Sequence, residues 1–457
     1  MTDADIIVIG SGQAGVALAA RLVTAGKRVV LAEKGPLGGT CVNTGCTPTK
    51  TMVASARAAH VARTAPRLGV HTGEVHVDLA AVVARKDGIV KRWRDGVDKR
   101  LASAGVTVAR GHARFVAAKE LDVGGTRYRA PTIVINVGAK PVAPPIPGLD
   151  GVPWLDNDTV MRLTELPSHL LVIGGGYIGC EFGQMFRRFG ARVTILDAAP
   201  HLVSREDDDV CAAIEGVFRA EGIELVLGTN IDKVGTDGGD LVVTAGGKTY
   251  RGSHLLVATG RRPSTEDLGC EVAGIALDGK GHVVADDHYK TSVDGVYAVG
   301  DCIDQPQFTH VAWDDHRLLF DALISGRVRS RGRRTIPYTT YVDPQVAGVG
   351  LTEKEAKRHG VAYEVATMPF GAIARATEVD ETAGLLKVLV DPKTEKLVGA
   401  AIVGAEAGEL IHVFLTMIEG GVPARVLVDA EMVHPAFAEG LQSVLMRLDR
   451  FALAFRA

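Results

Sequence analysis

The chain carries the same nucleotide-binding pattern twice, and this repeat limits the folds open to it more than any other feature. The first copy, DIIVIGSGQAG, is a short apolar run followed by Gly10, Gly12 and Gly15. Glycines at this spacing permit a tight turn and the close approach of a pyrophosphate, and the helix expected next offers free N–H groups to the phosphates. A second strand, RVVLAE, ends at Glu33, eighteen residues after Gly15, where a carboxylate can accept hydrogen bonds from a ribose.

The second copy, LLVIGGGYIG, places Gly174, Gly176 and Gly179 before the helical stretch CEFGQMFRRFG. The strand RVTILD then ends at Asp197, again eighteen residues after the third glycine. Two such folds imply two dinucleotides. Because Asp197 can bind a free 2′-hydroxyl and repels a 2′-phosphate, we expect NADH at this site, while two arginines nearby in the sequence leave NADPH possible.

Composition sets the broad class of the protein. A chain of 457 residues is too long for one core, and its hydrophobic fraction of 46% argues against disorder. The formal net charge of −3 gives no sign of a nucleic-acid partner. The N-terminus, MTDADIIVIG, lacks the basic region of a signal peptide, and no apolar run is as long as a membrane span. We therefore expect a cytoplasmic protein that binds neither membranes nor nucleic acids.

Breaks in composition mark the parts of the chain. A proline-rich linker covers 137–148, ATGRRP at 258–263 closes the second nucleotide fold, and the apolar strand of TSVDGVYAVGDC ends at Gly300 and Asp301. The basic stretch GRVRSRGRR, 326–334, is interpreted as a solvated connecting loop. From about 336 the character changes, with the predicted hairpin LLKVLVDPKTEKLVGAAIVG followed by amphipathic helices.

Two cysteines stand close together in GGTCVNTGCTPTK, residues 38–50, and could form a metal clip, a permanent crosslink or a redox pair. A zinc site needs about four ligands, and no second Cys or His pair with ligand spacing follows, so no metal site is predicted. A crosslink over so short a loop constrains little of the unfolded chain. A redox pair therefore fits best, since Cys46 lies near the start of a predicted helix, whose dipole lowers the pKa of a thiol.

These features together resemble the class I flavoprotein disulfide reductases, which include dihydrolipoamide dehydrogenase, glutathione reductase and mercuric reductase. The stretches QFTHVAWDDHR, PYTTYVDPQVAGVGLTEKEA and HPAFAEGL are most similar to the mercuric or copper reductase-like branch, with its reactive-chlorine resistance flavoproteins. The resemblance implies an α/β homodimer with two Rossmann-like dinucleotide-binding domains and a C-terminal α+β dimerisation domain. The expected domains are FAD-binding at 1–148 and 263–335, NAD(P)-binding at 149–262, and dimerisation at 336–457.

The resemblance also implies roles for single residues. Cys46 would face the flavin and Cys41 would attack the substrate. Near the flavin, Lys50 and Glu181 would form a pair and Tyr177 would gate the nicotinamide pocket. His434 and Glu439 would form an acid–base dyad that reaches the cysteines of the other subunit. The further dinucleotide contacts implied are Gln13, Ala14, Lys34, Gly39, Thr40, Ala113, Gly138, Gly260 and Arg262, with Asp301 holding the ribityl chain of FAD.

The resulting hypothesis is an oxidoreductase that passes electrons from NAD(P)H through FAD to the Cys41–Cys46 disulfide and on to a small or protein disulfide. Alternatives are a metal-ion reductase using the same dithiol, a dihydrolipoamide dehydrogenase, and a flavin redox sensor or complex subunit without ordinary turnover. No cysteine follows Cys302, which weakens a specialised mercuric reductase. The triplet from Trp313 to Asp315 resembles the metal-reductase branch, and the sequence suggests no mechanism for it.

Overall fold

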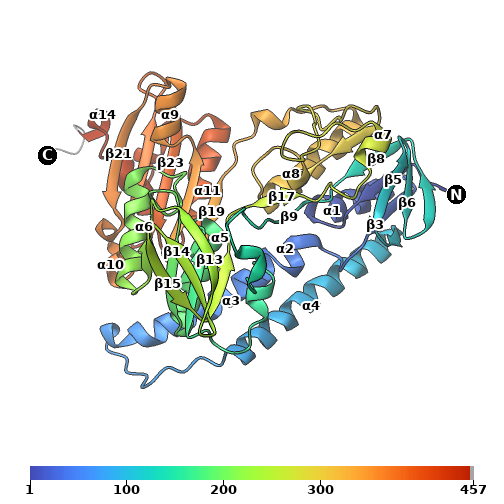
Figure 1. Ribbon diagram of the computed structural model, residues 1–457. Coiled ribbons are helices and arrows are strands. Elements are labelled where there is room, and N and C mark those ends of the chain that lie inside the picture. The colour runs from blue at the N-terminus through green and yellow to red at the C-terminus, as the bar shows by residue number, and fades with distance from the viewer. Residues whose placement is uncertain (453–457) are drawn as a thin grey trace. The chain divides into compact units, whose positions relative to one another are not determined.

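The computed structural model describes residues 1–452, which form two compact units (Figure 1). Unit 1 contains residues 1–51, 81–142 and 260–334, and unit 2 contains residues 52–80, 143–259 and those from 335 onward. The domain boundaries expected at 148, 262 and 335 stay predictions. In the part of the chain that the structure describes, no helix is both long enough and apolar enough to cross a bilayer.

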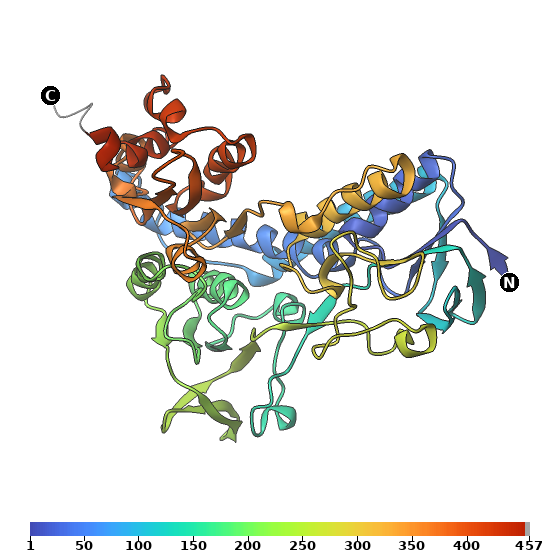
Figure 2. The ribbon, with the colours of Figure 1, turned by 90° about the horizontal axis from the view of Figure 1, so that it is seen from above.

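A five-stranded parallel sheet forms the centre of unit 1. All four residues of its middle strand, β2, are buried, as expected for a parallel sheet covered on both faces. Helix α1 (Gln13–Thr24) lies against helix α8 (Thr309–Phe320), as Figure 2 shows in blue and gold. The strands are, in spatial order, β18 (Val296–Ala298), β8 (Thr132–Ile135), β2 (Ile6–Ile9), β3 (Val29–Glu33) and β4 (Thr107–Arg110).

The other elements of unit 1 are smaller. Two further sheets have the strand orders β1-β7-β6-β5 and β17-β9. Their strands are β1 (Thr2–Asp3), β5 (Ala113–Ala117), β6 (Glu120–Val123), β7 (Thr126–Arg129), β9 (Ala139–Pro141) and β17 (Arg261–Pro263). The helical elements are α2 (Gly39–Asn43), α7 (Cys270–Ala273), the 3-10 turns η4 (Gly300–Cys302) and η6 (Arg331–Arg333), and the π-helical turn η5 (Asp321–Ser325). Two helices are shared between the units: α3 (Cys46–Thr64) starts in unit 1, and all but the first two residues of α4 (Leu79–Ala104) belong to unit 1.

The parallel sheet brings four separate chain segments to one edge. The carboxyl ends of parallel strands lie on the same side of a sheet, which is where ligands bind in open α/β folds. The segment beginning at Gly10 follows β2, Glu33 ends β3, Asn136 follows β8, and η4 follows β18. The fold therefore places four groups at a single edge of the sheet: the glycine turn, the Glu33 carboxylate, the Asn136 amide and the η4 turn that carries Asp301.

The basic connector at 326–334 corrects the sequence-based interpretation, because it is not simply a solvated loop. The guanidinium of Arg331 donates to the carbonyl oxygens of Asp286, Asp304 and Ala285 at 3.1–3.2 Å. Only 13% of the Arg334 side chain is exposed, and it donates to Asp315 at 2.8 Å. Backbone carbonyls of distant residues hold Arg331, a buried carboxylate holds Arg334, and composition gives no sign of either kind of partner.

Unit 2 contains the second parallel sheet and an antiparallel ribbon beside it. The parallel strands are, in spatial order, β12 (Glu224–Val226), β11 (Arg192–Leu196), β10 (His169–Ile173) and β16 (His254–Val257). Helix α5 (Tyr177–Phe189) connects β10 to β11, and α6 (Asp208–Ala220) connects β11 to β12. The ribbon consists of β13 (Ile231–Asp237), β14 (Asp240–Ala245) and β15 (Lys248–Gly252). The second glycine pattern thus lies at a strand-to-helix turn, as predicted.

The C-terminal part of unit 2 is a five-stranded antiparallel sheet, orange in Figure 1. Its strands are, in spatial order, β19 (Tyr338–Thr340), β20 (Gln345–Gly350), β23 (Leu397–Gly404), β22 (Leu385–Val390) and β21 (Glu364–Pro369). The antiparallel pairing of β22 with β23 confirms the predicted hairpin. Helix α11 (Ala407–Gly420) packs on β20 and β23. The remaining helical elements are α9 (Glu353–His359), α10 (Ala374–Glu378), α12 (Ala424–Val428), α13 (Glu439–Leu445), α14 (Asp449–Ala452) and the 3-10 turns η1 (Ala65–Leu68), η2 (Leu149–Gly151), η3 (Thr159–Arg162) and η7 (Phe370–Ala372).

Candidate active site

The first glycine turn has the shape that a bound pyrophosphate requires. A Cβ atom on Gly15 would lie 2.0 Å from the carbonyl oxygen of Gly10, so no larger residue fits there. Gly12 is the N-cap of α1 and provides no side-chain cap, which leaves the first N–H groups of the helix available to an anion. The predicted contacts Gln13 and Ala14 are the first two residues of this helix. The turn fits the phosphates of a dinucleotide.

The acid at the end of β3 faces the same turn. Glu33 accepts hydrogen bonds from the backbone N–H of Ser11 at 2.8 Å and from its hydroxyl at 2.6 Å, and its other oxygen accepts from the N–H of Gly35 at 2.7 Å. Ser11 is fully buried, and its hydroxyl oxygen also accepts from the N–H of Gly38 at 3.1 Å. The carboxylate is therefore fixed beside the glycine turn, and its binding of a ribose hydroxyl stays a prediction.

Asn136 completes this edge, and sequence reasoning missed it. Its side-chain amide donates to the carbonyl oxygen of Gly10 at 3.0 Å. A Cβ atom on Gly300 would lie 3.1 Å from its Oδ1 atom. One buried amide thus lies between the first glycine turn and the η4 turn that carries Asp301. The position directly after a buried strand is the only signal that could have indicated it.

The second nucleotide turn repeats this geometry in unit 2. A Cβ atom on Gly179 would lie 1.8 Å from the carbonyl oxygen of Gly174, and Gly176 is the N-cap of α5. Asp197 accepts a hydrogen bond from the N–H of Gly175, and its other oxygen accepts from the N–H of Ala199 at 2.8 Å. Both predicted acids therefore fold back toward their own glycine turns.

The two cysteines lie in adjacent helices of unit 1, and both are thiols in this structure. Cys41 is in α2, and Cys46 is the first residue of the 19-residue helix α3, where the helix dipole favours negative charge. The Sγ atom of Cys46 lies 3.0 Å from the hydroxyl of Thr309. The hydrogen bond with Cys46, together with burial, raises the pKa of the Cys41 thiol well above its usual range, while Thr309 and Lys50 act in the opposite direction.

Thr309 is a second residue that sequence reasoning missed. It is the first residue of α8 and comes 263 positions after Cys46. Its hydroxyl contacts Cys46 directly, and its hydrogen bond to Cys41 lowers the pKa of that thiol. A hydroxyl between the two sulfurs can stabilise a thiolate on either of them.

The turn η4 places Asp301 at the edge of the parallel sheet, where it is partly buried. Burial raises the pKa of Asp301, and the positive charge of Arg261 opposes that rise. Asp301 follows Gly300, whose φ of +73° is a left-handed conformation that suits glycine. The role of Asp301 in binding a dinucleotide stays a prediction.

His434 and Glu439 form a pair in unit 2. The Nδ1 atom of His434 lies 3.0 Å from one carboxylate oxygen of Glu439 and 3.2 Å from the other. The carboxylate also accepts from the N–H of Ala436 at 2.8 Å, and these two contacts lower the pKa of Glu439. With 68% of its side chain exposed and Nδ1 held, the His434 ring has Nε2 available for proton transfer at the surface.

The other predicted residues lie in both units. Tyr177 is the first residue of α5 and 41% exposed, and Glu181 is buried and accepts from the N–H of Tyr341 at 2.8 Å. Lys50 belongs to unit 1, so its pairing with Glu181 stays a prediction. Arg262 pairs with Glu266 at 2.5 Å. The remaining predicted contacts are Lys34 after β3, Gly39 and Thr40 in α2, Ala113 in β5, Gly138 before β9 and Gly260 before β17.

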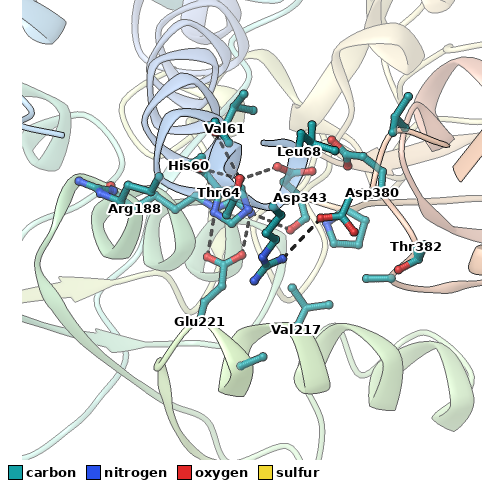
Figure 3. A pocket seen from close by; sticks show the side chains of 18 of the residues that line it. His60, Val61, Thr64, Leu68, Arg188, Val217, Glu221, Asp343, Asp380 and Thr382 are labelled. Atoms are coloured by element: carbon teal, nitrogen blue, oxygen red, sulfur yellow. Dashed lines mark hydrogen bonds and ion pairs between the residues drawn. The ribbon is translucent and has the colours of Figure 1, made fainter. Parts of the chain in front are cut away.

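A separate cavity of about 740 Å³ lies within unit 2, between the end of α3, helices α5 and α6, and residues 379–383 (Figure 3). Its charged groups bind one another. Arg188 pairs with Glu221 at 2.6 Å and also with Asp343, while Arg57 bridges Asp343 and Glu381 at 2.8 Å each. None of the predicted site residues lines it. The cavity therefore has a structural ion-pair network rather than the chemistry of the cysteine site.

The chain is similar to several known proteins over nearly its whole length. It is 35% identical over 447 residues to the pyridine nucleotide-disulfide oxidoreductase RclA of Escherichia coli K12, covering 96% of this chain and 98% of that protein. It is 37% identical over 454 residues to the mercuric reductase of Streptomyces lividans, covering 96% and 95%. The structure of the HOCl-induced flavoprotein disulfide reductase RclA superimposes with a TM-score of 0.90 at 35% identity, covering 97% and 99% of the two chains. Its Cu(II) complex gives the same TM-score at 34% identity, with the same coverage.

Two family descriptions cover the chain. Residues 4–315 match pyridine nucleotide-disulphide oxidoreductase, and residues 336–445 match the dimerisation domain of the same family. These matches confirm the predicted resemblance, the fold class, and FAD with NAD(P)H as cofactors, and the dimerisation domain supports a homodimer. The chain belongs to the pyridine nucleotide-disulphide oxidoreductases.

Proposed function

We propose that this flavoprotein reductase uses NADH to reduce a low-molecular-weight or protein disulfide through its Cys41–Cys46 pair. The observation that carries the proposal is the placement of the two thiols. Cys46 occupies the first turn of a long helix beside Thr309, and its hydrogen bond with Cys41, together with burial, raises the pKa of the Cys41 thiol, so that the pair keeps one proton. An exchange reaction needs one sulfur that is stable as a thiolate and one whose proton is removed only when substrate is attacked.

The cofactors have matching positions in the chain. The turn at Gly10, Gly12 and Gly15 with Glu33 would hold the adenosine diphosphate part of FAD, and Asp301 would hold its ribityl chain. The turn at Gly174, Gly176 and Gly179 with Asp197 would hold NADH. FAD would supply the hydride-accepting and two-electron chemistry that links the nicotinamide to the Cys41–Cys46 disulfide. The protein holds the two cysteines in place and removes or supplies the protons of their thiols.

Residues of this chain can carry out every step of the thiol–disulfide exchange, with one proton taken from water. His434 removes the proton of Cys41, and the Cys41 thiolate attacks one substrate sulfur, which forms a mixed disulfide and breaks the substrate S–S bond. His434 returns the proton to the departing thiolate. The Cys46 thiolate then attacks Cys41, which restores the Cys41–Cys46 disulfide and releases the second substrate thiolate, which takes a proton from water. The family resemblance assigns His434 to the cysteines of the other subunit.

A direct test compares acceptors and variants in the purified holoenzyme. NADH and NADPH oxidation would be measured with lipoamide, glutathione disulfide, a mycothiol-type disulfide, Hg²⁺ and Cu²⁺. We expect NADH oxidation with at least one disulfide, lost in Cys41→Ser and Cys46→Ser and kept in Cys270→Ala, a buried thiol of α7 outside the pair. Full turnover in both serine variants would refute the proposal.

A metal-ion reductase is the second candidate, and the comparisons give it specific support. A mercuric reductase shares 37% identity with this chain, and one solved structure of RclA is a Cu(II) complex. A metal ion held by two thiolates accepts electrons without taking up protons, so His434→Ala should spare metal reduction while slowing disulfide reduction. Metal-dependent NADH oxidation that far exceeds every disulfide rate in the wild-type protein would favour this candidate.

A further inference from the structure

Asp315 is a buried carboxylate that accepts four hydrogen bonds. It lies in α8 and has no exposed surface. Its Oδ1 atom accepts from the hydroxyl of Tyr289 at 2.8 Å and from the guanidinium of Arg334 at 2.8 Å. Its Oδ2 atom accepts from the N–H of Gly300 and from the amide of Gln305, both at 2.7 Å. A buried charge with four donors is stable where it lies and fixes whatever it binds.

The bonded groups form a closed ring around Gly300. Gln305 donates to Asp315 and also to the carbonyl oxygen of Gly300 at 3.1 Å. Arg334 donates to Asp315 and, through its other nitrogen, to Oε1 of Gln305 at 3.2 Å. Asp315 therefore binds the N–H of Gly300, and Gln305 binds its carbonyl oxygen. Arg334 binds both of these side chains. The residue that follows Gly300 is Asp301.

The ring explains two sequence features that the proposed function leaves unused. The Trp313–Asp315 triplet has no part in the cysteine chemistry, and the basic connector at 326–334 looks like a solvated loop in the sequence. In the structure the last arginine of the connector is the cation that pairs with the last residue of the triplet. Asp315 binds the backbone of the η4 turn, and Arg334 holds Asp315 and Gln305 in place.

We propose that Asp315, with Gln305 and Arg334, is a positioning residue that fixes the η4 turn so that Asp301 is preorganised to bind the ribityl chain of FAD. This inference rests on the role proposed for Asp301. Preorganisation means that the carboxylate of Asp301 needs little ordering when the flavin binds, so loss of the ring weakens binding through Asp301 and not through general loss of stability.

A double-mutant cycle on the FAD dissociation constant tests this. The holoenzyme is diluted serially, and released flavin is measured by its fluorescence, which requires no turnover. We expect Asp301→Ala to weaken binding roughly tenfold to a hundredfold and Asp315→Asn roughly tenfold. Because Asp315 acts through Asp301, the double variant should bind within about twofold of Asp301→Ala.

Asp321→Asn is the matched control. It removes an Asp–Arg ion pair of 2.9 Å to Arg329 of the same connector without touching the η4 turn, so its FAD affinity should equal that of the wild type. If Asp315→Asn does not fold, Gln305→Ala takes its place, because the half-buried side chain of Gln305 also holds Gly300. We then expect FAD binding to be threefold to tenfold weaker. In the Asp301→Ala background, Gln305→Ala should not weaken FAD binding further.

Three results would overturn the inference. The first is wild-type FAD affinity in Asp315→Asn, and the second is a double variant whose loss equals the product of the two single losses. The third is wild-type affinity in Asp301→Ala, which would remove Asp301 from the FAD site. None of them affects the test of disulfide turnover in the cysteine variants, so the two proposals fail separately.

Discussion

Replacement of His434 by alanine should separate the two halves of the catalytic cycle. The structure raises the pKa of Cys41 well above its usual range, so the thiolate is a minor species at neutral pH without a base. General-base catalysis contributes about 10²–10⁴-fold, and we expect disulfide reduction by His434→Ala to fall by that factor. The His434 side chain is 68% exposed, so its loss should change the free energy of unfolding by no more than about 0.5 kcal/mol.

Two assays distinguish this outcome from a general defect. Steady-state NADH oxidation with a disulfide should fall, whereas reduction of the flavin by NADH, followed by absorbance in a stopped-flow instrument, should stay near the wild-type rate. Glu439→Gln keeps a hydrogen-bond acceptor at Nδ1 of His434 but removes the charge, so its disulfide rate should lie between those of the wild type and His434→Ala. His412→Ala, an exposed histidine on α11, is the control. A disulfide rate within threefold of wild type, or an equal loss of flavin reduction, would refute the reasoning.

Three further predictions concern the surroundings of the site. Asp197→Ser should lower kcat/KM for NADH about tenfold to a hundredfold, because it removes the carboxylate proposed to accept a hydrogen bond from the ribose hydroxyl. The value of kcat/KM for NADPH should change less, and steady-state kinetics with both nucleotides checks this. Arg188→Met should lower the free energy of unfolding by about 3–5 kcal/mol, because it removes the cation paired with Glu221 and one of the two cations paired with Asp343, at a side chain that is 6% exposed. Arg219→Met, at 54% exposure, should cost less than about 1 kcal/mol in the same denaturant titrations. Burial raises the pKa of Glu206 to about 7, so the folded protein binds this proton more tightly than the unfolded chain does. The stability gained from the bound proton, on the order of 3 kcal/mol, is complete below the ordinary pKa of 4.5 and is lost as the pH rises through 7. Glu206→Gln should therefore flatten the decline of the unfolding midpoint between pH 5 and 8.

The sequence was sufficient for features that depend on neighbours in the chain. The turns at Gly10 and Gly174 are predictable because steric contact inside a single strand–turn–helix unit requires glycine, and the spacing to Glu33 and Asp197 follows from the length of that unit. The hairpin of β22 and β23 is predictable for the same local reason.

Contacts between distant segments could not be predicted in this way. Thr309 is 263 residues from the cysteine it contacts, and Asn136 approaches the first glycine turn from a different strand. Arg334 was assigned to a solvated loop because composition records charge but not partners, and its partner Asp315 is buried in another element. These residues become visible only once the order of the parallel strands is known, because that order decides which chain segments meet.

The choice between a disulfide and a metal ion as acceptor depends on protons. Reduction of a disulfide to two thiols consumes two electrons and two protons, whereas reduction of a metal ion bound by two thiolates consumes electrons alone. The hydrogen bond between Cys41 and Cys46, with burial, raises the pKa of the Cys41 thiol, so the pair keeps one proton, and this suits a site that must deliver a proton to a leaving sulfur. A histidine oriented by a carboxylate is the group that such a delivery requires, and His434 and Glu439 provide it at 3.0 Å. On this reasoning the disulfide rate of the wild-type protein should follow the ionisation of a histidine as pH changes, and its metal-reduction rate should follow the ionisation of a thiol.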